Sequence, residues 1–248
     1  MRVDVFFGPQ EVAAADVANR AVAVVDVLRA STTIAVALAN GARAVIPLAS
    51  GEEVVSRAKS LAKSEVKLAG ERKMQAIPGF DMGNSPLEFT KEVVEGKTIL
   101  MSTTNGTSAI LSVQGARDVM IASYVNFSAV LSMLRAALRG GTDVAIVCAG
   151  HEKHYAIEDS ACAGLFVRHI TEKHSKAEIN DGAFAAMLID KKFGSNLKRL
   201  FATSSHGIAL RDAGFGNDLV ACGKPDTVPV IPIYQDRQIT KLGPDRAR

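Results

Sequence analysis

Short apolar runs alternate with longer segments of helical spacing along the chain. Runs such as AVAVV and VAIVC contain no polar residue, which is typical of strands buried on both faces of a parallel sheet. This pattern predicts strands at 3–7, 21–27, 44–48, 66–69, 98–101, 118–122, 143–148 and 228–233. It predicts helices at 32–40, 51–63, 106–113, 127–138, 159–169, 181–191 and 195–203.

The order of these elements is that of repeated βα units. We therefore expect an α/β fold with a mostly parallel sheet, helices on both faces and a more helical C-terminal third. The length of 248 residues allows one large domain or two small ones. Because no Pro- or Ser-rich linker divides the chain, we expect one compact domain over residues 1–248, with subdomains 1–140 and 141–248 as the alternative.

Two segments of the chain resemble each other. STTIAVALANGARAV at 31–45 aligns with NGTSAILSVQGARDV at 105–119, and both contain a Gly-Ala-Arg turn. One interpretation is two ordinary βα units, each ending its helix at a glycine. The other is a pair of polar turns at the carboxyl ends of strands, where doubly wound sheets bind ligands.

Composition and charge exclude several function classes. The 29 basic residues exceed the 26 acidic ones by only three and form no long run, and the chain has 5% aromatic residues and no Trp. These values disfavour nucleic-acid partners and aromatic stacking platforms. No apolar run has the length of a membrane span or signal peptide, and Cys148, Cys162 and Cys222 are odd in number and widely spaced. We expect reduced thiols and a cytoplasmic location, without membrane partners.

The first candidate constellation is VVDVLRASTT. Asp26 closes an apolar strand, Arg29 follows, and Ser31, Thr32 and Thr33 open a helix. A guanidinium, hydroxyls and free helix amides could converge here on an anion. Helix capping by Ser31 alone is the competing explanation.

Two further polar segments follow later strands. Residues 69–89 place Glu71, Arg72, Asp81 and Asn84 in a stretch rich in Gly and Pro, and such loops often carry sites when they are not simply mobile. In MSTTNGTSAI, the hydroxyls and amides around Gly106 could bind an oxyanion or could merely cap the helix.

A fourth segment, VCAGHEKHYAIEDSACAG, places Glu158 and Asp159 side by side at a helix start. They could be simple partners of the helix dipole. Together with acids of the earlier segments they would also supply the oxygen ligands that Mg²⁺ prefers. His151 and His154 lack the H-E-x-x-H spacing of a zinc helix, so their role stays open, with a lid over the anion as one option.

Four motifs in this order, DVLRAST, GERKMQAIPGFDMGNSP, STTNGT and CAGHEKHYAIEDSACAG, resemble the 2-phosphosulfolactate phosphatase family across most of residues 20–165. The late segment SSHGIALRDAGFGNDLVACGKPD also looks like that family. The resemblance implies an α/β fold of the family's own type. It also implies Mg²⁺-dependent hydrolysis of 2-phospho-3-sulfolactate to 3-sulfolactate and phosphate, a step in coenzyme M biosynthesis.

The resemblance and the residue chemistry together give an expected site for a small anionic phospho-acid. We expect Asp26, Asp81, Glu158 and Asp159 to hold Mg²⁺, and Asp26, Arg29, Glu71 and Asp81 to act in catalysis. We expect substrate contacts from Ser31, Thr32, Arg72, Asn84, Asn105, Gly106 and Thr107. Water attack and covalent attack by Asp26 both stay open. So do another phospho-acid substrate, a non-catalytic anion-binding module and a homo-oligomeric state.

Overall fold

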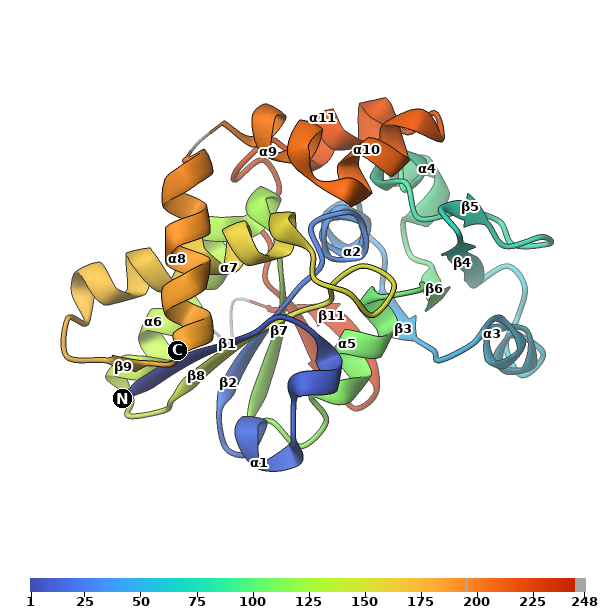
Figure 1. The fold of residues 1–248 in the computed structure, drawn as a ribbon. Coiled ribbons are helices and arrows are strands. Elements are labelled where there is room, and N and C mark those ends of the chain that lie inside the picture. Colours follow the sequence, from blue (N-terminus) through green and yellow to red (C-terminus); the bar gives the residue numbers. More distant parts are fainter. Residues whose placement is uncertain (195, 244–248) are drawn as a thin grey trace.

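The protein is described by a computed structural model that covers residues 1–194 and 196–243 (Figure 1). Within these residues a sheet has the strand order β5-β4-β6-β3-β11-β10-β7-β2-β8-β1-β9. The strands are β1 (Arg2–Phe6), β2 (Ala21–Val25), β3 (Ala44–Pro47), β4 (Val66–Arg72), β5 (Gln75–Ala76), β6 (Thr98–Ser102), β7 (Asp118–Ala122), β8 (Val144–Cys148), β9 (Glu178–Ile179), β10 (Pro232–Gln235) and β11 (Gln238–Lys241).

The helices connect these strands and form most of the C-terminal third. They are α1 (Ala14–Val17), α2 (Ala30–Ala39), α3 (Gly51–Ala58), α4 (Lys91–Val94), α5 (Gly106–Ser112), α6 (Phe127–Arg139), α7 (Ile157–Lys173), α8 (Asp181–Phe193), α9 (Leu197–Thr203), α10 (Ser205–Asp212) and α11 (Gly216–Cys222). None of the helices in the described part of the chain has the length and apolarity needed to cross a membrane.

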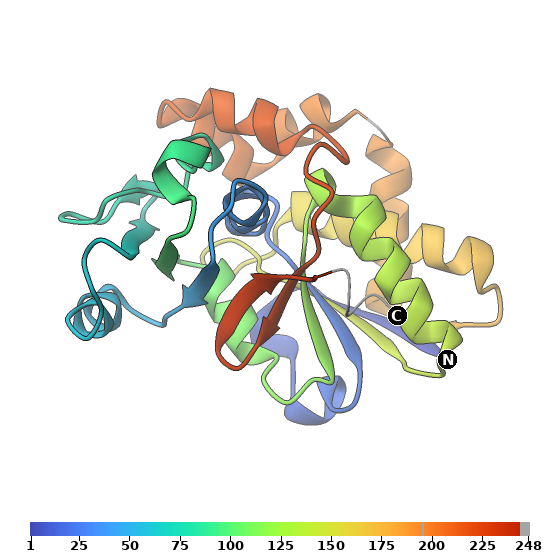
Figure 2. The same ribbon diagram turned by 180° about the vertical axis from the view of Figure 1, so that it is seen from behind.

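The sheet consists of two parallel blocks joined by a hairpin. Strands β4, β6 and β3 form one block, and β7, β2, β8, β1 and β9 form the other. The hairpin β10–β11 lies between them and pairs antiparallel with β7 and β3 (Figure 2). β3 pairs antiparallel with β11, β11 with β10, and β10 with β7. The strands of one block therefore run opposite to those of the other.

The two similar segments of the sequence are the connections between these blocks. The chain passes from β2 through α2 to β3, and later from β6 through α5 back to β7. Each connection therefore leaves one block and enters the other. The start of α5 lies directly against Asp26, so the segments that follow β2 and β6 meet in space.

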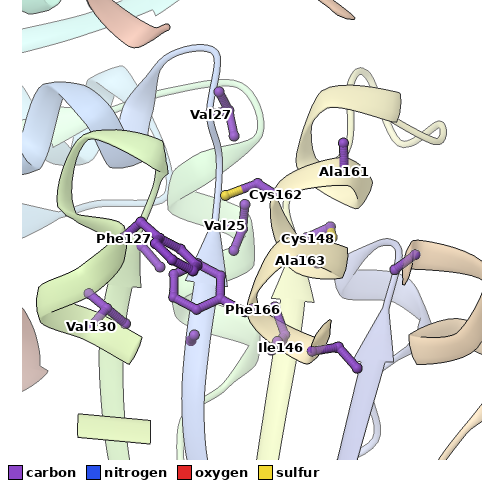
Figure 3. Close-up of a cluster of buried hydrophobic side chains, with 14 of the residues drawn as sticks. Val25, Val27, Phe127, Val130, Ile146, Cys148, Ala161, Cys162, Ala163 and Phe166 are labelled. Carbon is purple, nitrogen blue, oxygen red and sulfur yellow. The ribbon is translucent and has the colours of Figure 1, made fainter. Parts of the chain in front are cut away.

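Burial on both faces explains the continuous apolar strands. Ala21, Ala23 and Val25 of β2 belong to one core cluster with residues of α6 and α7. Figure 3 shows Val25 beside the rings of Phe127 and Phe166, which lie 4.6 Å apart. The alternate residues of β2 pack against α2 and α5 on the other face. Since strand side chains alternate between the faces, helices on both sides require an apolar residue at every position.

The α/β class, the mostly parallel sheet and the helical C-terminal third are confirmed. The pattern missed β5, β9 and β11, which are short, and the helices α1, α4, α10 and α11. The strand expected at 228–233 begins only at Pro232, because Val228 donates its amide to Val125 instead of to a strand. The helix expected from Ser195 begins at Leu197, and Ser195 itself lies outside the described residues.

The close packing of α7 on α8 gives a stability prediction. A methyl group on Gly164 of α7 would overlap the backbone carbonyl of Ala186 in α8, whereas one on Gly216 of α11 meets no atom within 4 Å. Gly164→Ala should lower the free energy of unfolding by at least about 2 kcal/mol, since a backbone cannot yield as a side chain can. Gly216→Ala, the control, should change it by less than about 1 kcal/mol. Chemical denaturation measures both, and equal stabilities would contradict the packing described.

Candidate active site

The segments that follow β2, β4, β6 and β8 enclose a cavity of about 230 Å³, with α10 on another side. Residues after strands of both blocks line the cavity, because α2 and α5 connect one block to the other. Its polar lining consists of Asp26, Arg29, Glu71, Lys73, Asn84, Thr103, Thr104, Asn105, His151, Glu152 and His206.

Asp26 is the most deeply placed acid of this lining. It follows the last residue of β2 directly, is 5% exposed, and accepts a hydrogen bond from the amide of Ala30 at 3.2 Å. Burial raises the pKa of Asp26 to about 6. The charges of Glu71 and Glu158 raise this pKa further, while His206 and the Ala30 amide oppose the rise. The fold thus brings the pKa of Asp26 closer to neutral pH than that of an exposed carboxyl group.

Gly106 allows α5 to begin directly against this carboxylate. A Cβ atom at Gly106 would lie 2.6 Å from Oδ2 of Asp26 and 2.5 Å from the Cβ of Ala30. Both distances are too short for any side chain, so the two crossing helices meet here through a residue that has none. Gly106 therefore shapes the site by its lack of a side chain.

Glu71 joins the two strand ends of the first block. Its carboxylate accepts hydrogen bonds from the amide of Met74 at 3.0 Å, and from the amide of Thr104 at 2.8 Å and its hydroxyl at 3.2 Å. These donors fix the β4–β5 turn to the start of α5. The 7% exposed side chain also lines the cavity, so it is a rigidly held carboxylate beside Asp26.

Arg29 is buried and is positioned by the C-terminal helices. Its Nη1 donates to Oδ2 of Asp218 at 2.7 Å, Nη2 donates to the carbonyl of Met74, and the guanidinium lies 4.4 Å from the ring centre of Phe215. Ser85 in turn donates to the other oxygen of Asp218 at 2.6 Å. The guanidinium is therefore held in one orientation at the cavity wall.

The other lining groups include several without partners. Lys73 makes no ion pair among the described residues, and Oδ1 of Asn84 is buried without a hydrogen bond. Asn105 accepts from the amide of Glu152 at 2.9 Å, and its own NH₂ group donates to nothing in the described part of the chain. Buried polar atoms normally have partners, so the unpartnered oxygen of Asn84 indicates a polar ligand in the cavity. Lys73 is exposed and adds a positive charge to the same lining.

Glu158 and Asp159 at the start of α7 are engaged elsewhere. Asp159 accepts hydrogen bonds from the amides of Val27 and Gly150 and so ties the ends of β2 and β8 together. Burial raises its pKa, and the charges of Asp26 and Glu158 add to the rise. Glu158 is 1% exposed and lies 3.2 Å from Nδ1 of His206. Neither acid is part of the cavity lining.

The two histidines of the β8–α7 loop differ in placement. The ring of His151 lines the cavity and stacks on His206 at 4.0 Å between ring centres. Burial lowers the pKa of His151, and the neighbouring His206 lowers it further. His154 pairs with His151 only through the backbone and does not line the cavity.

Several residues expected to contact substrate make hydrogen bonds within the frame of the site. Ser31 accepts from the amide of Asp26, and Thr32 donates to the carbonyl of Val27. Thr107 bonds with Thr103 across the first turn of α5, and Arg72 donates to the hydroxyl of Ser102. Ser31, Thr32, Arg72, Gly106 and Thr107 are outside the lining, whereas Asn84 and Asn105 are within it.

Asp81 also lies outside this cavity. Its carboxylate, 41% exposed, accepts from the amide of Leu68 at 2.7 Å and lies 3.4 Å from Nζ of Lys67. It contributes to a different surface hollow near the start of β4. The side chain bonds to the backbone of β4, and the structure does not bring it to the cavity that Asp26 lines.

The donor set suits a hydrated Mg²⁺ more than a closed metal cage. No group of three or more His, Cys, Asp and Glu side chains within residues 1–194 and 196–243 could hold a metal ion. Of the four acids predicted to bind Mg²⁺, only Asp26 lines the cavity, where it is joined by Glu71 and the unpartnered oxygen of Asn84. One or two carboxylates, completed by water and substrate phosphate, are a common Mg²⁺ environment.

The sequence motifs did not single out several residues of this region. Lys73 and His206 line the cavity, and Phe215 and Asp218 hold Arg29. His206, Phe215 and Asp218 lie in the C-terminal helical segment, where nothing in composition or spacing marks a site. The only sequence signal was the family resemblance of the segment that contains them.

Comparisons with known proteins agree with the resemblance. A family model described as 2-phosphosulpholactate phosphatase matches residues 6–237. A protein of Symbiobacterium thermophilum named probable 2-phosphosulfolactate phosphatase is 40% identical over 229 residues, covering 92% of this chain and 97% of its own. Proteins of the same name from Clostridium beijerinckii and Thermotoga maritima are 35% and 36% identical, and cover 97% and 93% of this chain and 99% and 94% of their own. The chain belongs to the 2-phosphosulpholactate phosphatase family and is a phosphoric monoester hydrolase.

Proposed function

We propose that this enzyme hydrolyses 2-phospho-3-sulfolactate to 3-sulfolactate and phosphate with the help of Mg²⁺, a step in coenzyme M biosynthesis. The observation that carries the proposal is one cavity that combines the carboxylates of Asp26 and Glu71 with the cations of Arg29 and Lys73. Carboxylates alone would repel an anionic ester, and cations alone would not hold a metal ion. Their combination suits a polyanion bound together with a divalent cation.

The substrate carries a phosphate, a sulfonate and a carboxylate group. Arg29 is fixed by Asp218 and so offers its charge in a set direction, whereas Lys73 stands on the β4–β5 turn without an ion pair in the described structure. The free NH₂ group of Asn105 adds a neutral donor to the same cavity. These groups would neutralise and orient the anionic oxygens of the ester.

The carboxylates of Asp26 and Glu71 and the amide oxygen of Asn84 would hold Mg²⁺. When bound, Mg²⁺ would withdraw charge from the phosphoryl oxygens and thereby ease attack on phosphorus. Hydrogen bonds from Met74 and Thr104 keep Glu71 in place, and the amide of Ala30 does the same for Asp26. The chain's own part is therefore to present two immobile carboxylates to one side of the substrate.

A comparison of substrates tests this function. Arg29 and Lys73 recognise charge, and so a different small phospho-carboxylic acid is the second candidate. We expect the highest kcat/KM for phosphosulfolactate, lower values for phospholactate and phosphoglycolate, and no turnover after chelation of Mg²⁺. Equal values for all three would favour the second candidate. Absence of phosphate release from every one of them, or release that ignores chelation, would overturn the proposal.

Asp26→Asn should separate activity from stability. Loss of the carboxylate should lower kcat/KM at least about 100-fold, as for removal of a major electrostatic group. The pKa of Asp26 is raised from 3.8 to about 6 in the fold, so burial of the charge weakens folding above pH 6 and leaves it unaffected below pH 4. The uncharged variant should therefore be more stable by about 2–3 kcal/mol at pH 8 without Mg²⁺, and equal at pH 4. Denaturation at both pH values measures this, and a variant less stable at pH 8 would contradict it.

Glu71→Gln and Asp81→Asn form a matched pair for the metal site. Both remove one charge from neighbouring segments, but only Glu71 lines the cavity. Glu71→Gln should raise the Mg²⁺ concentration needed for half-maximal activity about 10-fold or more, whereas Asp81→Asn should leave it unchanged. Titration of activity with Mg²⁺ measures both. If only Asp81→Asn raised the Mg²⁺ concentration needed for half-maximal activity, Asp81 and not Glu71 would belong to the metal site.

A further inference from the structure

His206 occupies a position that the proposed reaction does not yet use. It lies in the first turn of α10, where Ser204 accepts the amide hydrogen of Gly207 and caps the helix. The side chain is 8% exposed and reaches the cavity beside Asp26 and His151. Three elements distant in sequence, the end of β2, the β8–α7 loop and α10, therefore meet at this imidazole.

Two contacts fix the ring of His206. Its Nδ1 lies 3.2 Å from Oε1 of the buried Glu158, and this contact orients the ring. One face stacks on His151, with 22° between the ring planes. The other nitrogen, Nε2, makes no hydrogen bond among the described residues. A histidine can exchange a proton with a ligand when a carboxylate holds one ring nitrogen and the other nitrogen is free. His206 has this arrangement.

The chemistry of the ester creates a need for such a group. Hydrolysis of a 2-phospho-acid expels a secondary alkoxide, which is a strong base and a poor leaving group unless it receives a proton. Arg29 does not release protons, and Asp26 and Glu71 are the groups assigned to the metal ion. His151 has no carboxylate partner in the described structure, its Nδ1 is buried without a hydrogen bond, and burial lowers its pKa.

We propose that His206 is the proton donor to the leaving oxygen, and this inference rests on the proposed function. As the bond between phosphorus and the ester oxygen breaks, its electron pair stays on that oxygen, which takes the proton from Nε2 of His206. The alcohol leaves, and water adds its oxygen to phosphorus and releases one proton to solvent as phosphate forms. The neutral imidazole regains one proton from solvent, so no net proton is consumed by the histidine. Glu158 is a positioning residue, since it acts on the substrate only through His206.

Other charged groups face the same imidazole. Asp26 approaches from the end of β2, Glu158 from α7 and His151 from the β8–α7 loop. The imidazole therefore faces carboxylates from two different elements and one further imidazole.

Leaving groups of different basicity provide the test. Phospholactate and phosphoenolpyruvate both carry a phosphate beside a carboxylate, but the enolate expelled from the second is a much weaker base than an alkoxide. p-Nitrophenyl phosphate, with a still weaker leaving base, extends the series. In His206→Asn, kcat/KM should fall about 100-fold or more for phospholactate and less than about 10-fold for the two activated esters.

The controls separate a chemical role from a structural one. His174→Asn makes the same change at the far end of α7 and should leave all three rates unchanged. His206→Gln is measured in parallel, with thermal unfolding of each variant, so that a folding defect in one variant does not decide the result. Glu158→Gln should show the same preference for activated esters to a smaller degree.

The possible results are distinct. A steeper dependence of kcat/KM on leaving-group basicity in the His206 variants than in the unmodified enzyme supports the proposal. Equal falls for all three esters, or no fall at all, would overturn it. Phosphate release from phosphosulfolactate by the unmodified enzyme, lost on chelation of Mg²⁺, would uphold the proposed function in either case, so failure of the two proposals can be told apart.

Discussion

The buried carboxylate of Asp26 is the constraint on which the rest of the site depends. A negative charge at the end of an apolar strand is unfavourable unless neighbouring groups stabilise it. The fold provides the amide of Ala30, a helix start without a side chain at Gly106, and an imidazole opposite. Each of these fixes a different element, so the positions of α2, α5 and α10 are all coupled to one acidic side chain.

The two-block sheet explains how residues far apart in sequence reach one cavity. In a doubly wound sheet, ligands bind where neighbouring connections diverge from the strand ends. Here the corresponding place lies where α2 and α5 cross between blocks, so Asp26 of one block faces Glu71 and Thr104 of the other. The C-terminal helices then close the cavity with His206 and hold Arg29 through Asp218.

Much of the fold could be predicted because local patterns determine it. Uninterrupted apolar runs predicted the buried strands, and the repeated segment at 31–45 and 105–119 marked both crossing connections. The site was less accessible to such reasoning. Asp81 lies in a polar motif next to Asn84, yet the motif does not reveal that its side chain turns back to Leu68. Arg29 and Asp218, separated by 189 residues, meet only through tertiary packing.

The hairpin β10–β11 has a consequence for how the protein assembles. It contains the last strands in chain order of the described structure, yet it lies at the seam of the sheet and bridges β7 and β3. During synthesis each parallel block can form from its own strands, but the seam between them stays open until residues 232–241 leave the ribosome. Until then β3 and β7 expose unpaired edges to other chains. Completion of the sheet is thus a late, long-range step in folding, which makes the interval before it the period of greatest exposure to aggregation.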